Sequence, residues 1–320
     1  MRGRLLPLSL VLLAPFSGCA AGSDGLAQTR ARPTPSVNRP AAATPTPTPA
    51  ARTEREFEEH VAALRRRLPS REFTIVIERP FVVVGDGGRE AVESSARGTV
   101  KWAVDLLKRD YFTKDPADIL DVWLFKDAES YEKHRAALFG PGPDTPYGYY
   151  SAQHKALVMN IATGGGTLVH EIVHPFVAAN FPDCPTWLNE GLGSLYEQSG
   201  ERDGHIIGYT NWRLPGLQKA IRERRVRTFK ELTALSTDDF YSKETGTNYA
   251  QARYLCYYLQ ERGLLTRFYQ DFLTNRAADP TGFETLKKTL GVEDMDAFQK
   301  DWEKFALGLS EEVRLTPLRP

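Results

Sequence analysis

The chain has 320 residues, in which 41 lysine and arginine residues balance 41 aspartate and glutamate residues. This neutral balance excludes a strongly basic protein that attracts nucleic acid through its overall electrostatic field. Hydrophobic residues make up 41% of the chain and charged residues 26%, which is typical of a sequence that buries a globular core.

The first 18 residues have the pattern of a secretory signal. Arg2 and Arg4 precede an apolar run over residues 5–16, shorter than the roughly 20 residues that a membrane-spanning helix needs. The run leads into Phe16-Ser17-Gly18-Cys19, which resembles the lipobox of bacterial lipoproteins. This resemblance implies lipidation of Cys19, export, and anchoring to the lipid bilayer of the bacterial cell envelope, at its periplasmic or outer face. The alternative is an ordinary cleavage site at which Cys19 has no role.

Residues 19–52 are rich in alanine, threonine and proline and contain no aromatic residue. Such a segment cannot bury enough apolar surface to fold, and its Thr-Pro repeats favour an extended spacer. The folded domain is therefore predicted over residues 53–320, where 35 basic residues stand against 40 acidic ones. This acidic balance makes nucleic acid a still poorer partner.

Within this domain the hydrophobic pattern predicts a mixed α/β lobe followed by an α-helical lobe, an α+β class. Thr53 is expected to cap the first helix, and Arg79-Pro80 to separate two strands or to bend one. The expected elements are a helix through residues 57–68, strands within 73–86, a helix over 92–107, a strand over 119–125, a helix over 128–138, one or two strands over 149–161, and helices from 167 onward.

The pattern that carries chemistry is His170-Glu171-Ile172-Val173-His174. On a helix, residues four apart lie on one face, so the imidazoles of His170 and His174 can bind one metal ion. Glu171 lies beside them, where a carboxylate can take a proton from a metal-activated water instead of binding the metal. The motif predicts a hydrolytic metal site on a helix.

Glu190 is the candidate third ligand. It lies in Pro185–Gln198, which has helical spacing, and two prolines in the preceding residues 180–185 indicate a turn. The turn would bring the second helix back antiparallel to the first and direct Glu190 at the two histidines. Three protein ligands leave one position for water, as catalytic zinc sites require.

These motifs resemble the gluzincin metallopeptidases, the clan of thermolysin and aminopeptidase N, and especially the peptidase MA-like proteins. Trp187-Leu188-Asn189-Glu190-Gly191 matches the ligand motif of the aminopeptidase N-like members letter for letter. The resemblance covers roughly residues 118–260 and is specific at two motifs. It implies a thermolysin-like fold with the zinc helix between the two lobes, one Zn²⁺ ion, and hydrolysis of peptide bonds in a peptide or protein substrate.

The same resemblance extends to Tyr249, 59 residues after Glu190. In the aminopeptidase-like families a tyrosine at the start of a Tyr-x-x-small helix donates a hydrogen bond to the oxyanion, and Tyr249-Ala250-Gln251-Ala252 fits that pattern. The resemblance therefore implies a catalytic role for Tyr249. The alternative is a tyrosine that packs in the core of an aromatic helix.

The sequence departs from the family at two places. Residues 157–166 read LVMNIATGGG and lack the glutamate that holds the free amine of an aminopeptidase substrate, which favours an endopeptidase. Pro175 directly follows the second histidine and is expected to kink the helix just after the ligands. The strand over 155–160 is expected to pair with an extended substrate as an added strand.

The sequence thus predicts a zinc metallopeptidase. His170, His174 and Glu190 are expected to bind the metal, and Glu171 and Tyr249 to act on the substrate. There are two alternatives. The first is a peptidase fold that serves only as a binding module of the envelope, and the second is a zinc amidase that acts on a cell-wall link. Cys184 and Cys256 could form a disulfide or remain two thiols. His205 is a candidate second hydrogen-bond donor in the site or a loop histidine without a role.

Overall fold

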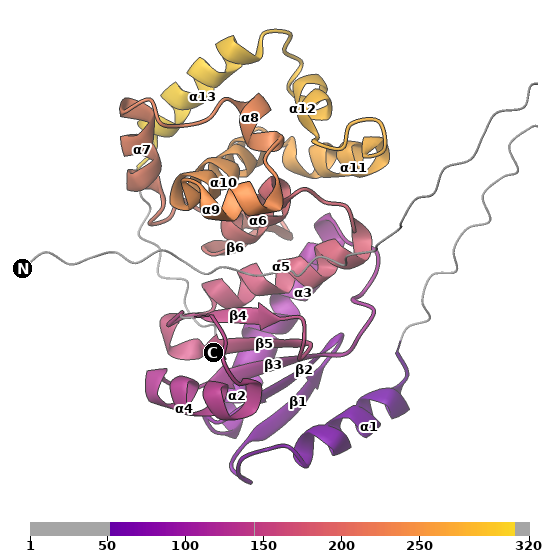
Figure 1. Ribbon diagram of the computed structural model, residues 1–320. Coiled ribbons are helices and arrows are strands. Elements are labelled where there is room, and N and C mark those ends of the chain that lie inside the picture. The colour runs from indigo at the N-terminus through magenta and orange to yellow at the C-terminus, as the bar shows by residue number, and fades with distance from the viewer. Residues whose placement is uncertain (1–51, 144, 311–320) are drawn as a thin grey trace, which may run out of the picture.

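The computed structural model describes residues 52–143 and 145–310, which form an α+β fold as the sequence predicts. A mixed sheet with its covering helices makes up the first lobe, and helices dominate the second (Figure 1). The predictions for the signal, for lipidation at Cys19 and for nearly all of the spacer fall outside the described residues. Within these residues, no helix has the length and apolar character that a membrane span requires.

The sheet has five strands in the order β1-β2-β3-β5-β4. β2 pairs with β3 and β3 with β5 in parallel, while the two outer pairs, β1 with β2 and β4 with β5, are antiparallel. The strand bounds are β1 (Thr74–Glu78), β2 (Phe81–Gly85), β3 (Leu120–Phe125), β4 (Gly148–Ser151) and β5 (Ala156–Asn160). Residues 73–86 therefore contain two strands, β1 and β2, and residues 149–161 contain two more, β4 and β5.

The topology corrects one expectation. β5 is paired on both sides, by β3 and by β4, so its backbone cannot accept an additional strand. The edge of the sheet on this side is β4, which the sequence pattern did not distinguish from β5. Any extended ligand that adds to the sheet here must pair with β4.

Alternating side chains of the central strands enter two separate cores. Val82, Trp123 and Val158 pack on one face with residues of α1 (Glu54–Arg65) and α4 (Ala128–Phe139). Their sequence neighbours point to the other face, where they join the core that continues into the helical lobe. That face is covered by a continuous helical stretch of α2 (Arg89–Ser95), the π-helix η1 (Ala96–Lys101) and α3 (Trp102–Asp110), and by α5 (Gly166–Asn180).

The second lobe begins after α5 and is almost entirely helical. Its members are α6 (Thr186–Leu195), β6 (Ser199–Arg202), β7 (His205–Gly208), α7 (Leu214–Arg222), α8 (Phe229–Thr233), α9 (Thr237–Ser242), α10 (Thr245–Glu261), α11 (Leu265–Asn275), α12 (Phe283–Leu290) and α13 (Met295–Gly308). The hairpin of β6 and β7 is an exception to the predicted run of helices. The short 3-10 helix η2 (Ile161–Thr163) connects β5 to α5.

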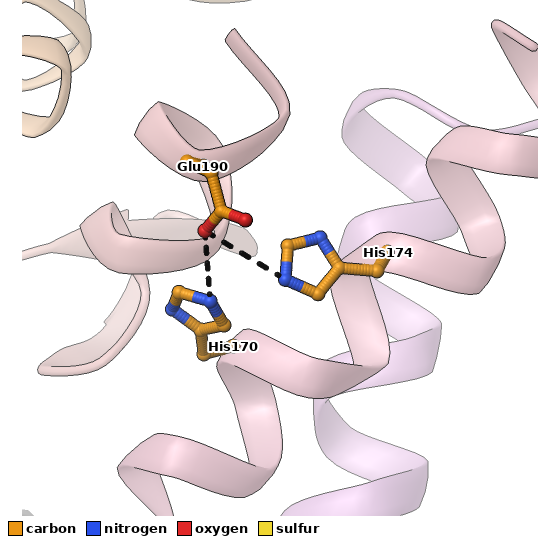
Figure 2. A group of neighbouring side chains, drawn as sticks. All are labelled: His170, His174 and Glu190. Atoms are coloured by element: carbon orange, nitrogen blue, oxygen red, sulfur yellow. Dashed lines mark ion pairs between the residues drawn. The ribbon is translucent and has the colours of Figure 1, made fainter. Parts of the chain in front are cut away.

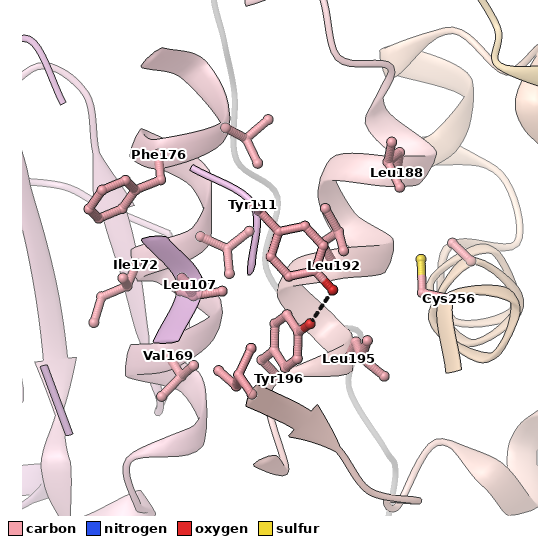
Figure 3. Close-up of a cluster of buried hydrophobic side chains, with 14 of the residues drawn as sticks. Leu107, Tyr111, Val169, Ile172, Phe176, Leu188, Leu192, Leu195, Tyr196 and Cys256 are labelled. Carbon is pink, nitrogen blue, oxygen red and sulfur yellow. Dashed lines mark hydrogen bonds between the residues drawn. The ribbon is translucent and has the colours of Figure 1, made fainter. Parts of the chain in front are cut away.

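α5 lies between the lobes and joins their cores (Figure 3). Val169, Ile172 and Phe176 on α5 pack in the same cluster as Leu192 on α6, and these four side chains are at most 3% exposed. Residues of α3 belong to this cluster as well. Pro175 lies inside α5, and the helix continues through it to Asn180. A helix buried on this many sides has little freedom to move, so it is a rigid support for the side chains on its remaining face.

Arg253 on α10 attaches the end of α6 to the helical lobe. Its side chain is fully buried, and its guanidinium donates hydrogen bonds to the backbone carbonyls of Ser194, Leu195 and Tyr209 at 2.8, 3.3 and 2.5 Å. The last carbonyls of a helix lack partners within the helix. Arg253 supplies partners for two of them at the end of α6.

We predict that Arg253→Met lowers the free energy of unfolding by about 1–3 kcal/mol, because it removes three buried hydrogen bonds to backbone carbonyls. Arg222→Met is the matched control, since Arg222 is exposed in the last turn of α7 and its loss should change stability by less than about 0.5 kcal/mol. Urea unfolding of both variants with a chelator present measures the difference. Equal stability of the two variants would contradict this role for Arg253.

Candidate metal centre

α5 presents His170 and His174 on its one face that is not covered by the sheet or by α3. The two rings lie 4.8 Å apart between centroids, with Leu168, Ile172 and Val173 fully buried beneath them. The start of α5 also fits tightly against the second lobe. A Cβ on Gly166 would lie 2.0 Å from the backbone oxygen of Glu197, so only glycine is possible there.

α6 packs against α5 and brings Glu190 opposite the two histidines, as the sequence predicts (Figure 2). Glu190 Oε2 lies 3.3 Å from His170 Nε2 and 3.9 Å from His174 Nε2. Ligand atoms of the three residues all lie within 4.8 Å of one another, and Glu190 is only 2% exposed. Among the described residues, these three side chains are a group that could hold a metal ion.

The donor set fits a divalent cation such as Zn²⁺. Two imidazole nitrogens and one carboxylate oxygen are a common catalytic zinc set, and tetrahedral zinc places its ligand atoms about 3.3 Å apart. Glu190 Oε2, although buried, has no hydrogen-bond partner in the structure. Its contacts with the imidazoles, at 3.3 and 3.9 Å, leave a buried carboxylate oxygen without a hydrogen bond, and a cation between them would satisfy it.

Other side chains orient both histidines. His174 Nδ1 lies 3.0 Å from Asn189 Oδ1, so a proton on Nδ1 is held there and the lone pair of Nε2 faces Glu190. His170 Nδ1 lies 3.3 Å from Glu197 Oε1, which is an ion-pair contact and not a hydrogen bond of good geometry. Such partners hold a ligand ring in one orientation and make it a better donor to the metal.

Glu197 is itself fixed by a buried network. Arg213 donates to its two oxygens at 2.6 and 2.9 Å, and Asn211 donates a third hydrogen bond at 3.1 Å. The guanidinium of Arg213 also lies over the ring of Tyr249, 5.1 Å from its centroid. None of these three residues was expected from the sequence: Glu197 follows the end of α6, and Asn211 and Arg213 return to it only after the β6–β7 hairpin.

The buried charges shift the pKa values of the cluster in opposite directions. Burial opposes protonation of His170, but its contacts with Glu190 and Glu197 outweigh burial and raise its pKa to about 10. Burial raises the pKa of Glu190, yet His174, His170 and Tyr241 together outweigh burial and lower it to about 2. The metal-free cluster therefore pairs an ionised Glu190 with a protonated His170, and a bound cation would take the place of that proton.

Glu171 lies beside the cluster without belonging to it. The carboxyl group is 6% exposed, accepts a hydrogen bond from the backbone N–H of Tyr150 on β4, and leaves Oε2 without a partner. Burial raises its pKa above the usual range for a glutamate. This is an environment in which a carboxylate holds a proton more readily than it does in water.

Two tyrosines of the second lobe reach the cluster. Tyr249, at the start of α10, is 6% exposed, and burial together with the charges of Glu190 and Glu171 raises its pKa well above its usual value. Tyr241, at the end of α9, donates a hydrogen bond from its hydroxyl to Glu190 Oε1 at 2.5 Å. Tyr241 was not identified from the sequence, since 51 residues separate it from Glu190 and no local pattern marks it.

The remaining candidates have other surroundings. His205 Nδ1 contacts Asp110 Oδ1 at 2.6 Å, which attaches β7 to α3, and its side chain is 62% exposed, so the structure does not place it with the metal ligands. Cys184 and Cys256 are free thiols, so the structure shows no disulfide between them. Cys256 instead packs against α6, where a Cβ on Gly191 would lie 2.9 Å from its sulfur.

A family model described as a protein of unknown function (DUF1570) matches residues 164–277. The match runs from just before α5 to just after α11, so it contains the two histidines, Glu190 and both tyrosines. No curated protein matches the chain.

Gly193 offers a test of the cluster that leaves its donor atoms unchanged. A Cβ at this position on α6 would lie 3.2 Å from three ring atoms of His170, closer than side chains normally pack. We predict that Gly193→Ala displaces the His170 ring by a few tenths of an ångström and weakens Zn²⁺ affinity by about 10-fold or more. Competition with a chromophoric chelator measures the affinity.

Gly216→Ala is the matched control. Gly216 is also in a helix, and a Cβ there would meet no atom within 4 Å. The control variant should bind metal like the wild type and gain up to about 1 kcal/mol in stability from helix propensity. If Gly193→Ala also bound metal like the wild type, the proposed position of His170 against α6 would be wrong.

Proposed function

We propose that the protein is a zinc-dependent hydrolase of peptide bonds with the ligand arrangement of the gluzincins and a thermolysin-like catalytic fold. The single observation that carries the proposal is the convergence of His170, His174 and Glu190 Oε2 from two packed helices. Glu171, the residue after the first histidine, adds the carboxylate that hydrolysis needs. A site kept only for binding would not require that carboxylate in its buried position.

When bound, Zn²⁺ would supply a Lewis acid that polarises the scissile carbonyl and lowers the pKa of a water ligand. His170, His174 and Glu190 would hold the ion. Asn189 and Glu197 would keep the two imidazoles oriented, as their distances of 3.0 and 3.3 Å to the Nδ1 atoms indicate.

Glu171 is the proposed general base. It takes a proton from the attacking water and delivers that proton to the leaving amine as the carbon–nitrogen bond breaks. Burial raises the pKa of Glu171 above that of an exposed glutamate, which makes the carboxylate a stronger base toward water. The Tyr150 N–H holds one carboxyl oxygen and leaves Oε2 for the proton.

Tyr249 is the proposed donor to the oxyanion. Its ring lies next to Arg213, and its hydroxyl is close enough to Glu190 and Glu171 for their charges to raise its pKa. A raised pKa keeps the phenol protonated, and only a protonated phenol can donate a hydrogen bond to the developing negative charge.

The edge strand β4 suggests how an extended substrate would lie. In the described part of the chain β4 pairs only with β5, and its Tyr150 N–H contacts Glu171. A peptide added along β4 would pass beside the metal ligands. Because the sequence before α5 lacks the glutamate of the aminopeptidases, we propose an endopeptidase, tethered to the cell envelope through a lipidated Cys19.

The decisive variant is Glu171→Gln, which keeps the size of the side chain and removes the base. We predict that it binds one Zn²⁺ per chain like the wild type, while kcat for peptide cleavage falls by about 10²–10⁴-fold. Metal analysis and digestion of a diverse peptide library, followed by mass spectrometry, measure both. Glu90→Gln, an exposed glutamate on α2, is the control that should retain full activity.

Two results would reject the proposal. Full peptidase activity in zinc-loaded Glu171→Gln would remove Glu171 from the reaction. Zinc binding with no peptide cleavage by the wild type would redirect the site to a non-peptide amide or to a binding role, and digestion of cell-wall fragments would separate those two outcomes.

A further inference from the structure

The carboxylate of Glu190 uses its two oxygens for different partners. Oε1 accepts the hydrogen bond from the Tyr241 hydroxyl at 2.5 Å. Oε2 has no hydrogen-bond partner and is the oxygen that faces His170 Nε2 and His174 Nε2 at 3.3 and 3.9 Å. The carboxylate therefore offers one free oxygen to the position between the imidazoles.

Tyr241 is itself held firmly. Its neighbour Phe240 is fully buried, and Asn248 on α10 donates hydrogen bonds to the carbonyls of Phe240 and Lys243 at 3.0 and 2.6 Å. Thr245 donates to the carbonyl of Tyr241 itself at 2.6 Å. Hydrogen bonds thus hold the turn between α9 and α10 on both sides of Tyr241. They fix the backbone that carries the phenol independently of any ligand.

α9 is also attached to the helix that carries Glu190. The hydroxyls of Thr186, at the start of α6, and Thr237, at the start of α9, lie 2.8 Å apart. The Tyr241 ring packs against Phe240 and Tyr249, with centroids 5.6 and 6.2 Å away. These contacts fix the phenol relative to the carboxylate that it touches.

We propose that Tyr241 is a positioning residue that fixes Glu190 as a ligand through one oxygen, Oε2. This inference rests on the proposed metal site. Without the hydroxyl, Oε1 would be a buried acceptor with no partner, and the carboxylate would be free to rotate toward either imidazole or to offer both oxygens to the metal. Metal binding would then have to restrict the rotation of the carboxylate, and the affinity for the metal would fall.

The two neighbouring tyrosines thereby receive separate roles. The Tyr241 hydroxyl already donates to Glu190, whereas the Tyr249 hydroxyl lies within hydrogen-bond reach of Tyr241. A proton already donated to Glu190 is not available to a substrate oxyanion. Tyr241 therefore acts on the metal through Glu190, and Tyr249 remains the residue that would contact the substrate.

The test compares Tyr241→Phe, Tyr249→Phe and Tyr111→Phe in the full chain. Tyr111 is buried, and its hydroxyl bonds that of Tyr196 at 2.7 Å, so its loss reproduces the removal of a buried phenol hydrogen bond away from Glu190. Zn²⁺ affinity is measured for each by chelator competition, and peptide cleavage is measured at limiting and at saturating zinc.

Tyr241→Phe should bind Zn²⁺ about 10–100-fold more weakly than the wild type, as for other residues that orient a metal ligand, and saturating zinc should restore most of its cleavage. The other two variants should bind zinc within about threefold of the wild type. Tyr249→Phe should lose cleavage that zinc does not restore.

Wild-type zinc affinity in Tyr241→Phe would overturn the inference and leave the proposed function intact. Wild-type affinity combined with a loss of cleavage at saturating zinc would overturn it by making Tyr241 the oxyanion donor. A wild-type protein that binds no zinc would overturn both the inference and the proposed function, so the two failures are distinguishable.

Discussion

The architecture around the site depends on one buried carboxylate, that of Glu190, held opposite two imidazoles. Removing a carboxylate from water is costly unless an opposite charge or hydrogen bonds replace the lost solvation. Glu190 has one hydrogen bond, from Tyr241, and its remaining contacts are with His170 and His174. A protonated histidine or a bound cation must therefore balance its charge, and the neighbouring residues hold both histidines ready for that role.

The surrounding polar side chains form a connected series of contacts that extends away from the candidate metal position. Asn189 forms a hydrogen bond with one imidazole, and Glu197 lies in ion-pair contact with the other. Arg213 binds Glu197 through both carboxylate oxygens and then lies over the Tyr249 ring. The same arginine thus connects the residue beside a proposed metal ligand to the proposed oxyanion donor. A change at Arg213 would disturb both and could not separate them, which is why single phenol removals are more informative.

Close packing, and not only hydrogen bonding, sets the distance between the two ligand helices. α5 is buried between the sheet and the second lobe, so its position is determined by the shared core. Gly166, Gly191 and Gly193 lie where an added Cβ would meet Glu197, Cys256 and the His170 ring at 2.0, 2.9 and 3.2 Å. The absence of side chains at these three points lets α6 approach α5 and α10 closely enough for Glu190 to reach the histidines.

The part of this arrangement that follows from local spacing could be predicted from the sequence. His170, Glu171 and His174 share a helix, so 3.6-residue periodicity alone places them, and the turn before Glu190 is marked by prolines. The α+β class was predicted for the same reason, since strand and turn patterns are local, whereas the patterns at 73–86 and 149–161 each allow one strand or two. Tyr249 depended on resemblance, and its catalytic role stays a prediction.

What escaped prediction depends on long-range packing. Tyr241 and Arg213 reach the cluster from separate elements, and nothing within their own segments distinguishes them from other tyrosines and arginines. The choice between β4 and β5 as the sheet edge required the strand order, which periodicity does not contain. His205 resembled a site residue by type alone, and its contact with Asp110 gives it a structural role instead.

The most direct test of the central claim is a crystal structure of the zinc-loaded protein with anomalous diffraction measured at the zinc edge. We expect one strong anomalous peak per chain, bound by His170 Nε2, His174 Nε2 and Glu190 Oε2 at about 2.0–2.2 Å. The Tyr241 hydroxyl should remain on Glu190 Oε1. The absence of a peak at this position after loading, with His170 still paired directly to Glu190, would contradict the account.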